Sequence, residues 1–257
     1  MSNSDFPEGC AVVFGGSGGI GQAIARLLAS RGCDVVVTYF SRPDKAGDIV
    51  KEIQNIGRQA IALQCDVSSS SSVQNAFESG AAEFGRIHTV IYAGGRLFDV
   101  MPLADFPEKD FRAVIETDVI GFFNIAQAGI PHLRRGQGGS FTALITPAIV
   151  KTFALDALSA VPKTAVAMLV RHIAAEEGRH GIRANAVGPG FIDAGMTVPM
   201  RQNSPNAAGV LEKARRRTPI GRLGQPQDVA EVVAFLASSK ASFVTGQIMH
   251  ADGGLSA

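Results

Sequence analysis

The chain carries, close to its N-terminus, the stretch Val12-Val13-Phe14-Gly15-Gly16-Ser17-Gly18-Gly19-Ile20-Gly21. The apolar run from Ala11 to Phe14 predicts a buried strand, and apolar residues recur at helical spacing from Ile20 onward. The glycines between them predict a tight turn, and because glycine has no Cβ, a pyrophosphate can approach its backbone closely. The start of the helix adds unpaired N–H groups and a favourable dipole. Strand, turn and helix together predict a phosphate-binding site.

The glycine spacing fits the dinucleotide fingerprint in two ways. Gly16, Gly18 and Gly21 match Gly-x-Gly-x-x-Gly, and Gly15, Gly19 and Gly21 match a related, wider spacing. Glycine turns also serve plain strand-to-helix connections, but the strand before this one and the helix after it favour nucleotide binding. We expect the cofactor phosphates to contact the turn at Gly15, Ser17, Gly18, Gly19, Ile20 and Gly21.

Length and composition limit the classes to which the chain can belong. Its 257 residues are 46% hydrophobic and 18% charged, which is enough apolar material for a substantial core. The net charge of +1 indicates neither a nucleic acid nor a membrane surface as partner. Asp5 and Glu8 precede the first hydrophobic run without a basic residue, unlike a signal peptide, and no apolar run approaches membrane-spanning length.

The cysteines and histidines indicate no metal site. Cys10, Cys33 and Cys65 are odd in number and far apart, and the five histidines show no ligand spacing. We interpret the cysteines as reduced core residues of a cytoplasmic protein, with a catalytic thiol as the alternative.

The rest of the chain alternates apolar runs and helical patterns. Strands are predicted over residues 34–39, 59–63, 87–91, 141–145, 183–187 and 247–250. Helices are predicted over residues 44–56, from the serine run 68–72 to about 84, 105–133 with a break near Pro131, 157–177 and 227–237. Because no linker or repeat interrupts this alternation, we expect a single Rossmann-like domain over residues 1–257. Its core would be one doubly wound parallel sheet of about seven strands with helices on both faces.

In such a sheet ligands bind beyond the carboxyl ends of the strands, so the residues there are candidate cofactor contacts. The second strand runs into Thr38-Tyr39-Phe40-Ser41-Arg42, without the carboxylate that would hold the ribose hydroxyls of NAD. Ser41 and Arg42 suit a 2′-phosphate, which favours NADP(H) over NAD(H); the alternative is that Arg42 is a solvated loop residue. The other strand ends carry Cys65-Asp66-Val67, Tyr92-Ala93-Gly94-Gly95 and Gly188-Pro189-Gly190. We expect Ala93 and Gly94 to lie beside the cofactor.

The segment 191–219 contains Met, Pro and Asn, and its length and position predict a lid over the substrate. The basic residues 213 and 215–217 within it are better explained as a solvated helix face than as an anion site. Apolar side chains in this and neighbouring loops favour a partly apolar small-molecule substrate, with plain packing as the alternative. They are Phe98, Met101, Phe153, Phe191, Met196 and Met200.

These residues resemble the short-chain dehydrogenase/reductase family over nearly the whole chain, including its 3-oxoacyl-(acyl-carrier-protein) reductases. Gly15, Gly19 and Gly21 match the family's cofactor glycines, and Asp66-Val67 match the pair that contacts adenine. Pro189-Gly190, with Ile192, match the turn that holds the nicotinamide amide. Two carboxyl-terminal segments also match: Gly221-Arg222-Leu223-Gly224-Gln225-Pro226-Gln227-Asp228-Val229-Ala230 and Thr245-Gly246-Gln247…Asp252-Gly253-Gly254. The resemblance implies an NAD(P)-dependent oxidoreductase that forms a homotetramer or homodimer through the helices of the fourth and fifth crossovers. Gly18 stands where NADP-binding members often carry a basic residue.

The chain departs from this family at its catalytic positions. Members usually carry Asn-Asn-Ala-Gly after the fourth strand, where this chain has Tyr92-Ala93-Gly94-Gly95. The family's active-site asparagine falls on Asp118, and the serine that orients the substrate carbonyl falls on Thr146. The proton-donating tyrosine falls on Ser159, and only Lys163, which would also hold the nicotinamide ribose, stands unchanged.

These departures bear on how a carbonyl reduction would be completed, because the reaction needs a hydride at carbon and a proton at oxygen. A phenol suits the second task because its pKa of about 10 can be lowered by a nearby ammonium. Ser159 is shorter and far less acidic, and losing a positioned general acid typically costs about 10²–10⁴ in rate. Thr146 can still donate to a carbonyl, and Asp118 can pair with Lys163. The candidate proton sources are Lys163, a water held by Ser159, Tyr92 and Asp156.

Three functions fit this sequence. The one we favour is an NADP(H)-dependent oxidoreductase with altered protonation, which acts on a carbonyl or alcohol, or on a charged carbon–nitrogen double bond that needs the hydride alone. The second is a nucleotide-binding protein without turnover, acting as a sensor or as the inactive partner in a mixed oligomer. The third is non-redox chemistry in the same cleft, such as an isomerisation or a cyclisation.

Overall fold

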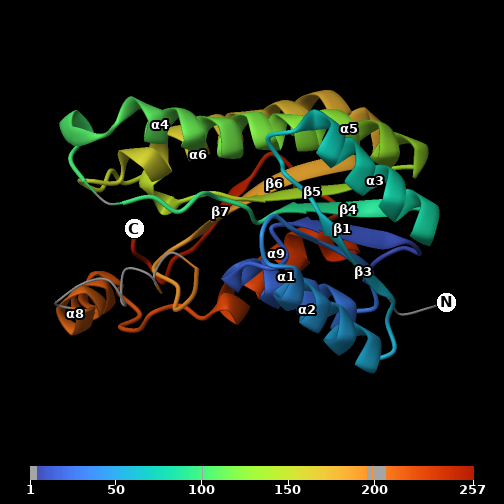
Figure 1. Cartoon of the computed structure of the whole chain (residues 1–257), viewed down its shortest axis with the longest axis horizontal. Helices are drawn as coiled ribbons and strands as arrows, with labels where there is room; N and C mark the ends of the chain where they lie inside the picture. Colours follow the sequence, from blue (N-terminus) through green and yellow to red (C-terminus); the bar gives the residue numbers. More distant parts are fainter. Residues whose placement is uncertain (1–4, 100, 196–197, 199–206) are drawn as a thin grey trace.

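A computed structural model of the chain describes residues 5–99, 101–195, 198 and 207–257 (Figure 1). Its centre is one sheet of seven strands in the order β3-β2-β1-β4-β5-β6-β7, and each strand is parallel to its neighbours. The strands are β1 Cys10–Phe14, β2 Asp34–Tyr39, β3 Ala60–Gln64, β4 Ile87–Tyr92, β5 Gly139–Leu144, β6 Ile182–Pro189 and β7 Ile248–Ala251. The predicted doubly wound parallel sheet is therefore confirmed.

Helices cover both faces of the sheet. The α-helices of the described residues are α1 Gly19–Ser30, α2 Pro43–Asn55, α3 Ser70–Phe84, α4 Glu108–Ile115, α5 Gly121–Arg135, α6 Ala157–Glu177, α8 Ala207–Arg217 and α9 Pro226–Ala237. Figure 1 shows α3, α4, α5 and α6 on one face and α1, α2 and α9 on the other, with α8 away from the sheet. The serine run caps α3 as expected, because the side chain of Ser69 accepts a hydrogen bond from the Ser72 N–H.

The apolar run of β1 builds the core because its side chains alternate between the two faces. Val12 and Phe14 belong to the cluster under α3, α5 and α6, whereas Ala11 and Val13 belong to the cluster under α1, α2 and α9. All five residues of β1 are buried, as expected for a central parallel strand covered on both sides. β1 pairs with β2 on one side and β4 on the other, so the strand order reverses at its carboxyl end. Sheets of this kind bind ligands at that switch point.

The long helical pattern over 105–133 is interrupted at a different place from the one predicted. Pro131 lies inside α5 without breaking it. Packing holds the helix there, since a Cβ on Gly129 would lie 2.8 Å from Phe77 and 3.0 Å from Phe141. The interruption is instead a π-helical turn, Glu116–Ile120, between α4 and α5. Such turns often accompany functional sites, and this one carries Asp118.

One helical stretch of the described residues, Glu108–Arg135, is long and apolar enough to cross a membrane by length and composition alone. Its most apolar part has a mean hydropathy of 1.2 and is 44% buried in the molecule. Phe122, Ile125 and Leu133 from this stretch lie in the core cluster. The core helices of proteins that do not enter membranes meet the same criterion. Polar residues interrupt the stretch Glu108–Arg135, so it is not an uninterrupted apolar run of membrane-spanning length.

The three cysteines are free and buried. Burial raises the pKa of the Cys10 thiol to about 12 and that of the Cys65 thiol to about 11, and it also raises the pKa of Cys33. A reactive thiol needs the thiolate form near neutral pH. The three residues therefore act as small apolar core side chains, and the alternative of a catalytic thiol has no support.

Candidate active site

The predicted phosphate turn follows β1 directly and is held by its own backbone. The Gly16 N–H donates to the Val13 carbonyl oxygen at 3.2 Å, and the Gly18 N–H donates to the Gly15 carbonyl oxygen at 2.9 Å. Gly15 has a φ of +77°, and a Cβ on Gly21 would lie 2.2 Å from the Gly15 oxygen. Both positions therefore require glycine, the first for its backbone conformation and the second for the close approach of α1.

Helix α1 begins at Gly19 without a side-chain cap, because its N-cap residue is Gly18. The N–H groups of the first helical turn therefore have neither an intrahelical partner nor a capping side chain. Such N–H groups and the positive end of the helix dipole suit the pyrophosphate of a dinucleotide. The turn observed here fits the group that the sequence predicts at this place.

Two other segments that the sequence places beside the cofactor pack against this turn. A Cβ on Gly15 would lie 2.8 Å from the Gly94 nitrogen and 2.9 Å from Ala93. A Cβ on Gly19 would lie 2.8 Å from both the Ala194 Cβ and the Gly195 nitrogen. The end of β4 and the segment after β6 thus meet the glycine turn at the switch point of the sheet.

The segment after β3 holds the side chains expected around the adenosine. The Asp66 carboxylate accepts from the Ser68 N–H at 3.0 Å and from the Ser68 hydroxyl at 2.6 Å. The Asn124 side chain donates to the Val67 carbonyl oxygen at 3.0 Å, and a Cβ on Gly121 would lie 2.7 Å from Val67. Contacts from α5 therefore fix this segment.

Ser41 and Arg42 lie between β2 and α2, and both side chains are exposed. Arg42 is the N-cap residue of α2 and makes no side-chain cap hydrogen bond. Both residues therefore lie beyond the carboxyl end of β2, where the sequence predicts them.

The Pro189-Gly190 turn at the end of β6 is held by the carboxyl-terminal part of the chain. The Gly190 N–H donates to the Ala251 carbonyl oxygen at 3.1 Å, and a Cβ on Gly190 would lie 2.7 Å from the Asp252 Cα. Ile192 is buried and forms an isolated parallel bridge with Gly224. The segments expected to hold the nicotinamide amide are thus braced by the segments 221–230 and 245–254.

Lys163 of α6 contacts the segment that follows β4. Its Nζ lies 3.2 Å from Asp118 Oδ2 and donates to the Gly94 carbonyl oxygen at 3.3 Å. Lys163 is 9% exposed and Asp118 is 3% exposed, so the pair is largely shielded from water. The ion pair expected between these residues is present.

Tyr92 completes this cluster beneath Lys163. Its phenol oxygen lies 3.2 Å from Asp118 Oδ1 and 3.1 Å from the Thr117 carbonyl oxygen, and its single proton is shared between these two acceptors. The Lys163 Nζ lies 5.0 Å from the centre of the Tyr92 ring. Burial, the nearby Asp118 charge and the hydrogen bond to Asp118 raise the pKa of Tyr92 well above its usual value. Tyr92 is 0% exposed, so its phenol is not a proton source for a substrate, contrary to one of the possibilities considered from the sequence.

The remaining catalytic candidates lie in and before α6. Thr146 accepts a hydrogen bond from the Ala148 N–H at 3.2 Å, which leaves its hydroxyl proton free to be donated. Ser159 lies in the first turn of α6 and is half-buried. Lys163 follows it by four residues, so the two side chains lie on one face of the helix. Burial raises the pKa of Asp156, the N-cap residue of α6, to about 6.

The predicted lid is only partly covered by the described residues. Met196, Met200 and residues 199–206 lie outside them. In α8, Glu212 pairs with Arg215 at 2.8 Å and with Arg216 at 2.7 Å on an exposed face, which agrees with a solvated helix face. The other candidate pocket residues are half-buried: Phe98, Met101, Phe153 and Phe191.

The parallel sheet and the uncapped glycine turn at its switch point define a dinucleotide-binding α/β protein. The chain belongs to the short-chain dehydrogenase/reductase family. The family model described as "Enoyl-(Acyl carrier protein) reductase" matches residues 15–256. Proteins of this family are oxidoreductases that bind nicotinamide cofactors.

Relatives of known name are similar over nearly their whole length. The cis-4-hydroxycyclohexanecarboxylate dehydrogenase of Sinomonas cyclohexanicum is 35% identical over 252 residues, which cover 98% of each chain. The 7alpha-hydroxysteroid dehydrogenase of Escherichia coli K12 is 34% identical, covering 99% of this chain and 98% of the other. A 3-oxoacyl-(acyl-carrier-protein) reductase of Staphylococcus aureus is 33% identical, covering 95% and 97%. These names support an oxidoreductase.

A solved structure of similar fold is a short-chain type dehydrogenase/reductase from Mycobacterium ulcerans. It superposes with a TM-score of 0.89 at 28% identity, over 98% of this chain and 90% of that one.

The glycine turn yields a direct test with a matched control. We expect Gly21→Ala to lower the free energy of unfolding by about 1–3 kcal/mol, since its Cβ meets the Gly15 oxygen, and to abolish nucleotide binding. Gly47→Ala in α2 has no atom within 4 Å of the new Cβ, so we expect it to stabilise the protein by about 0.5–1 kcal/mol. Thermal unfolding and calorimetric titration with NADPH measure both effects. Undiminished binding by the Gly21→Ala variant would contradict the role of the turn.

Proposed function

We propose that this protein is an NADP(H)-dependent oxidoreductase that transfers a hydride between the cofactor and the carbon of a carbonyl, alcohol or imine substrate. The observation that carries this proposal is the position of Gly94. Its nitrogen lies against Gly15 of the phosphate turn, and its carbonyl oxygen accepts from the Lys163 ammonium. One residue at the end of β4 thus connects the expected pyrophosphate site to the lysine expected at the nicotinamide ribose.

The residues fit the separate parts of such a cofactor. The glycine turn would hold the pyrophosphate, and Asp66 with Val67 would contact the adenine. Lys163 would hold the nicotinamide ribose, while Pro189, Gly190 and Ile192 would hold the carboxamide. Ser41 and Arg42 would meet the 2′-phosphate of NADP(H), for which an exposed guanidinium is well suited. When bound, the nicotinamide supplies or accepts the hydride.

We propose a partly apolar small molecule as substrate. Support comes from the half-buried Phe98, Met101, Phe153 and Phe191 in the surrounding loops, and from relatives named for ring-bearing alcohols such as a hydroxysteroid. Thr146 would donate its free hydroxyl proton to the substrate oxygen.

The proton would come from a group other than the usual phenol. Lys163 has two acceptors, Asp118 and the Gly94 oxygen, which leaves one N–H of its ammonium for another partner. The other sources are a water held by Ser159 and the Asp156 carboxyl, whose pKa of about 6 keeps part of it protonated near neutral pH. An imine that already carries a proton would need none of them.

Nucleotide binding without turnover is the second candidate function. The observation that favours it is Ser159, because its hydroxyl is a poor general acid at the position of the family's tyrosine. This protein would then act as a sensor or as the inactive partner in a mixed oligomer.

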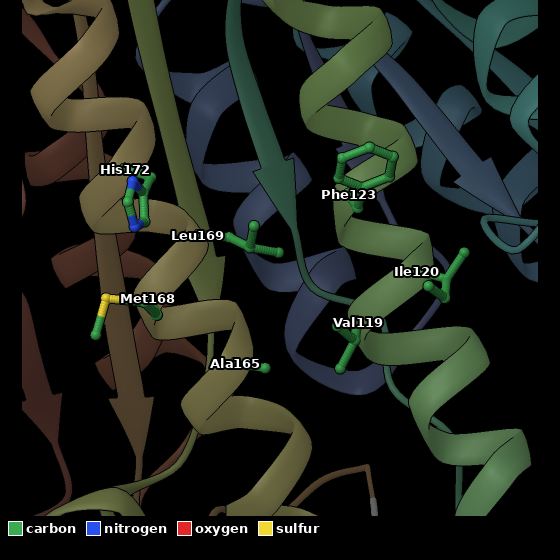
Figure 2. A pocket seen from close by; sticks show the side chains of 7 residues that line it. All are labelled: Val119, Ile120, Phe123, Ala165, Met168, Leu169 and His172. Carbon is green, nitrogen blue, oxygen red and sulfur yellow. The ribbon is translucent and has the colours of Figure 1, made fainter.

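We also propose that the protein is cytoplasmic and forms a homodimer or homotetramer through α5 and α6. A hollow of about 420 Å³ lies between these helices on the outside of the molecule (Figure 2). Figure 2 shows side chains from the π-helical turn, α5 and α6 around it: Val119, Ile120, Phe123, Ala165, Met168, Leu169 and His172. Phe123 is 45% exposed and Met168 is 50% exposed, which favours burial against a second copy.

The cofactor can be tested through Arg42. We expect the parent protein to bind NADPH more tightly than NADH and to pass its hydride to a member of a carbonyl and imine panel. Arg42→Ala should weaken NADPH binding about 10-fold and leave NADH binding within about twofold, because only the 2′-phosphate contact is lost. Calorimetric titration measures both, and Arg179→Ala, at an exposed arginine after α6, is the control. A parent that binds neither nucleotide would refute the proposal, and binding without transfer to any acceptor would favour the second candidate.

The altered general acid can be tested by restoring a phenol. We expect Ser159→Tyr to raise ketone reduction about 10-fold or more, because a positioned general acid typically supplies about 10²–10⁴ in rate. Ser159→Phe adds the same ring without the hydroxyl and should give no increase. Steady-state kinetics with saturating NADPH compare the two. Equal rates for both variants, with cofactor binding retained, would mean that the missing phenol does not limit the reaction.

The proposed oligomer can be tested at the same apolar face. We expect the parent to sediment with the mass of two or four chains and Met168→Asp to sediment as a single chain, because a buried unpaired charge opposes association. Ile56→Asp places the same charge on an exposed residue at the end of α2 and should leave the mass unchanged. A parent with the mass of one chain would contradict this part of the proposal.

A further inference from the structure

We propose that Tyr92 is a positioning residue that acts through Asp118 to hold the Lys163 ammonium at the nicotinamide end of the cofactor site. This inference rests on the proposed function. It concerns a side chain that never reaches the substrate, since Tyr92 is 0% exposed, and it gives that side chain a role beyond filling the core.

The two oxygens of Asp118 have separate partners. Oδ1 accepts the Tyr92 phenol proton at 3.2 Å, and Oδ2 faces the Lys163 Nζ at 3.2 Å. A carboxylate that is 3% exposed depends on such partners, because a buried charge without hydrogen bonds is costly. The phenol therefore restrains the rotation of the carboxylate, so that one oxygen faces the phenol and the other faces the ammonium.

The ammonium of Lys163 is held on three sides. It faces Asp118 Oδ2, donates to the Gly94 oxygen at 3.3 Å and lies 5.0 Å above the Tyr92 ring. Tyr92 thus contacts Lys163 with its ring and Asp118 with its hydroxyl. Gly95 lies beside this group, since an added Cβ would lie 3.8 Å from Nζ and 3.9 Å from Asp118 Oδ1. Two acceptors leave one N–H of the ammonium for a ligand.

Tyr92 itself has little freedom to move. It is the last residue of β4, in the middle of the sheet, and its ring lies 5.6 Å from the Phe122 ring. A Cβ on Gly94 would lie 2.8 Å from Tyr92 Cε2, so the chain after the strand closes over the ring. The phenol shares its proton with the Thr117 carbonyl oxygen at 3.1 Å, in the π-helical turn that carries Asp118. A rigid strand thereby sets the position of a charged group on a helix, which is the support that a precise site needs.

The test compares binding of the whole cofactor with binding of a fragment. We expect Tyr92→Phe to weaken binding of NADPH, or of NADH if the parent prefers it, by about 10-fold, because a hydrogen bond to a charged group is lost. Binding of adenosine 2′,5′-bisphosphate, or of ADP for an NADH-binding parent, should stay within about twofold, because the fragment ends before Lys163. Calorimetric titration gives both dissociation constants without requiring turnover.

A double-mutant cycle shows whether the effect passes through Asp118. In an Asp118→Asn background, Tyr92→Phe should weaken whole-cofactor binding by less than about threefold, since the carboxylate that the phenol orients is absent. Thr89→Val is the matched control, because it also removes one buried hydroxyl from β4. It should lower the melting temperature and leave both dissociation constants within about twofold of the parent.

The outcomes separate this inference from the proposed function. Equal weakening of cofactor and fragment, or a lower melting temperature with unchanged binding, would mean that Tyr92 only stabilises the fold and would overturn the inference. The same loss in both backgrounds would overturn the route through Asp118. A parent that binds no nicotinamide nucleotide would refute the proposed function, and this inference with it. If the Tyr92→Phe variant does not fold, Asp118→Asn alone should weaken binding of the whole cofactor and leave binding of the fragment unchanged. Unchanged binding of the whole cofactor by Asp118→Asn would count against the inference.

Discussion

The whole site depends on the contact between Gly15 and the end of β4. With no Cβ on Gly15, the phosphate turn packs directly on Ala93 and Gly94, and any larger side chain would meet backbone atoms at 2.8–2.9 Å. Because Gly94 also accepts from Lys163, the contact fixes the distance between the expected pyrophosphate site and the lysine. The two are brought together by adjacent parallel strands, β1 and β4, at the point where the strand order reverses.

The fold could be predicted because its signals are local. A central parallel strand is apolar throughout, which β1 shows, and α6 begins and ends at the residues where its helical pattern begins and ends. The helix interruption could not be predicted in this way. Proline is the usual helix breaker, but packing of Gly129 against Phe77 and Phe141 keeps α5 continuous past Pro131. The π-helical turn at Glu116–Ile120 has no such sequence signal.

The candidate site could be predicted in part. Residues at strand ends converge whatever their side chains, so the glycine turn, Ala93-Gly94 and Pro189-Gly190 could be assigned to one crevice from the order of the strands. The ion pair of Asp118 and Lys163 followed from their opposite charges and from the positions that the family resemblance implies for them. The direction of the Tyr92 ring could not be derived, because a residue at a strand end can face either the crevice or the core. Burial against Phe122 decides it, and the phenol binds Asp118 instead of a ligand.

The hydrogen bond between Tyr92 and Asp118 also constrains how this sequence can change over evolutionary time. Asparagines usually occupy both positions in the family. A residue at 92 without a hydrogen-bond donor would leave an oxygen of the buried Asp118 carboxylate unsatisfied, and a neutral residue at 118 would deprive the Tyr92 phenol of its charged acceptor. A change at one of these positions is therefore costly unless the other position still supplies a hydrogen-bond partner. Positions 92 and 118 should vary together among the descendants of this lineage.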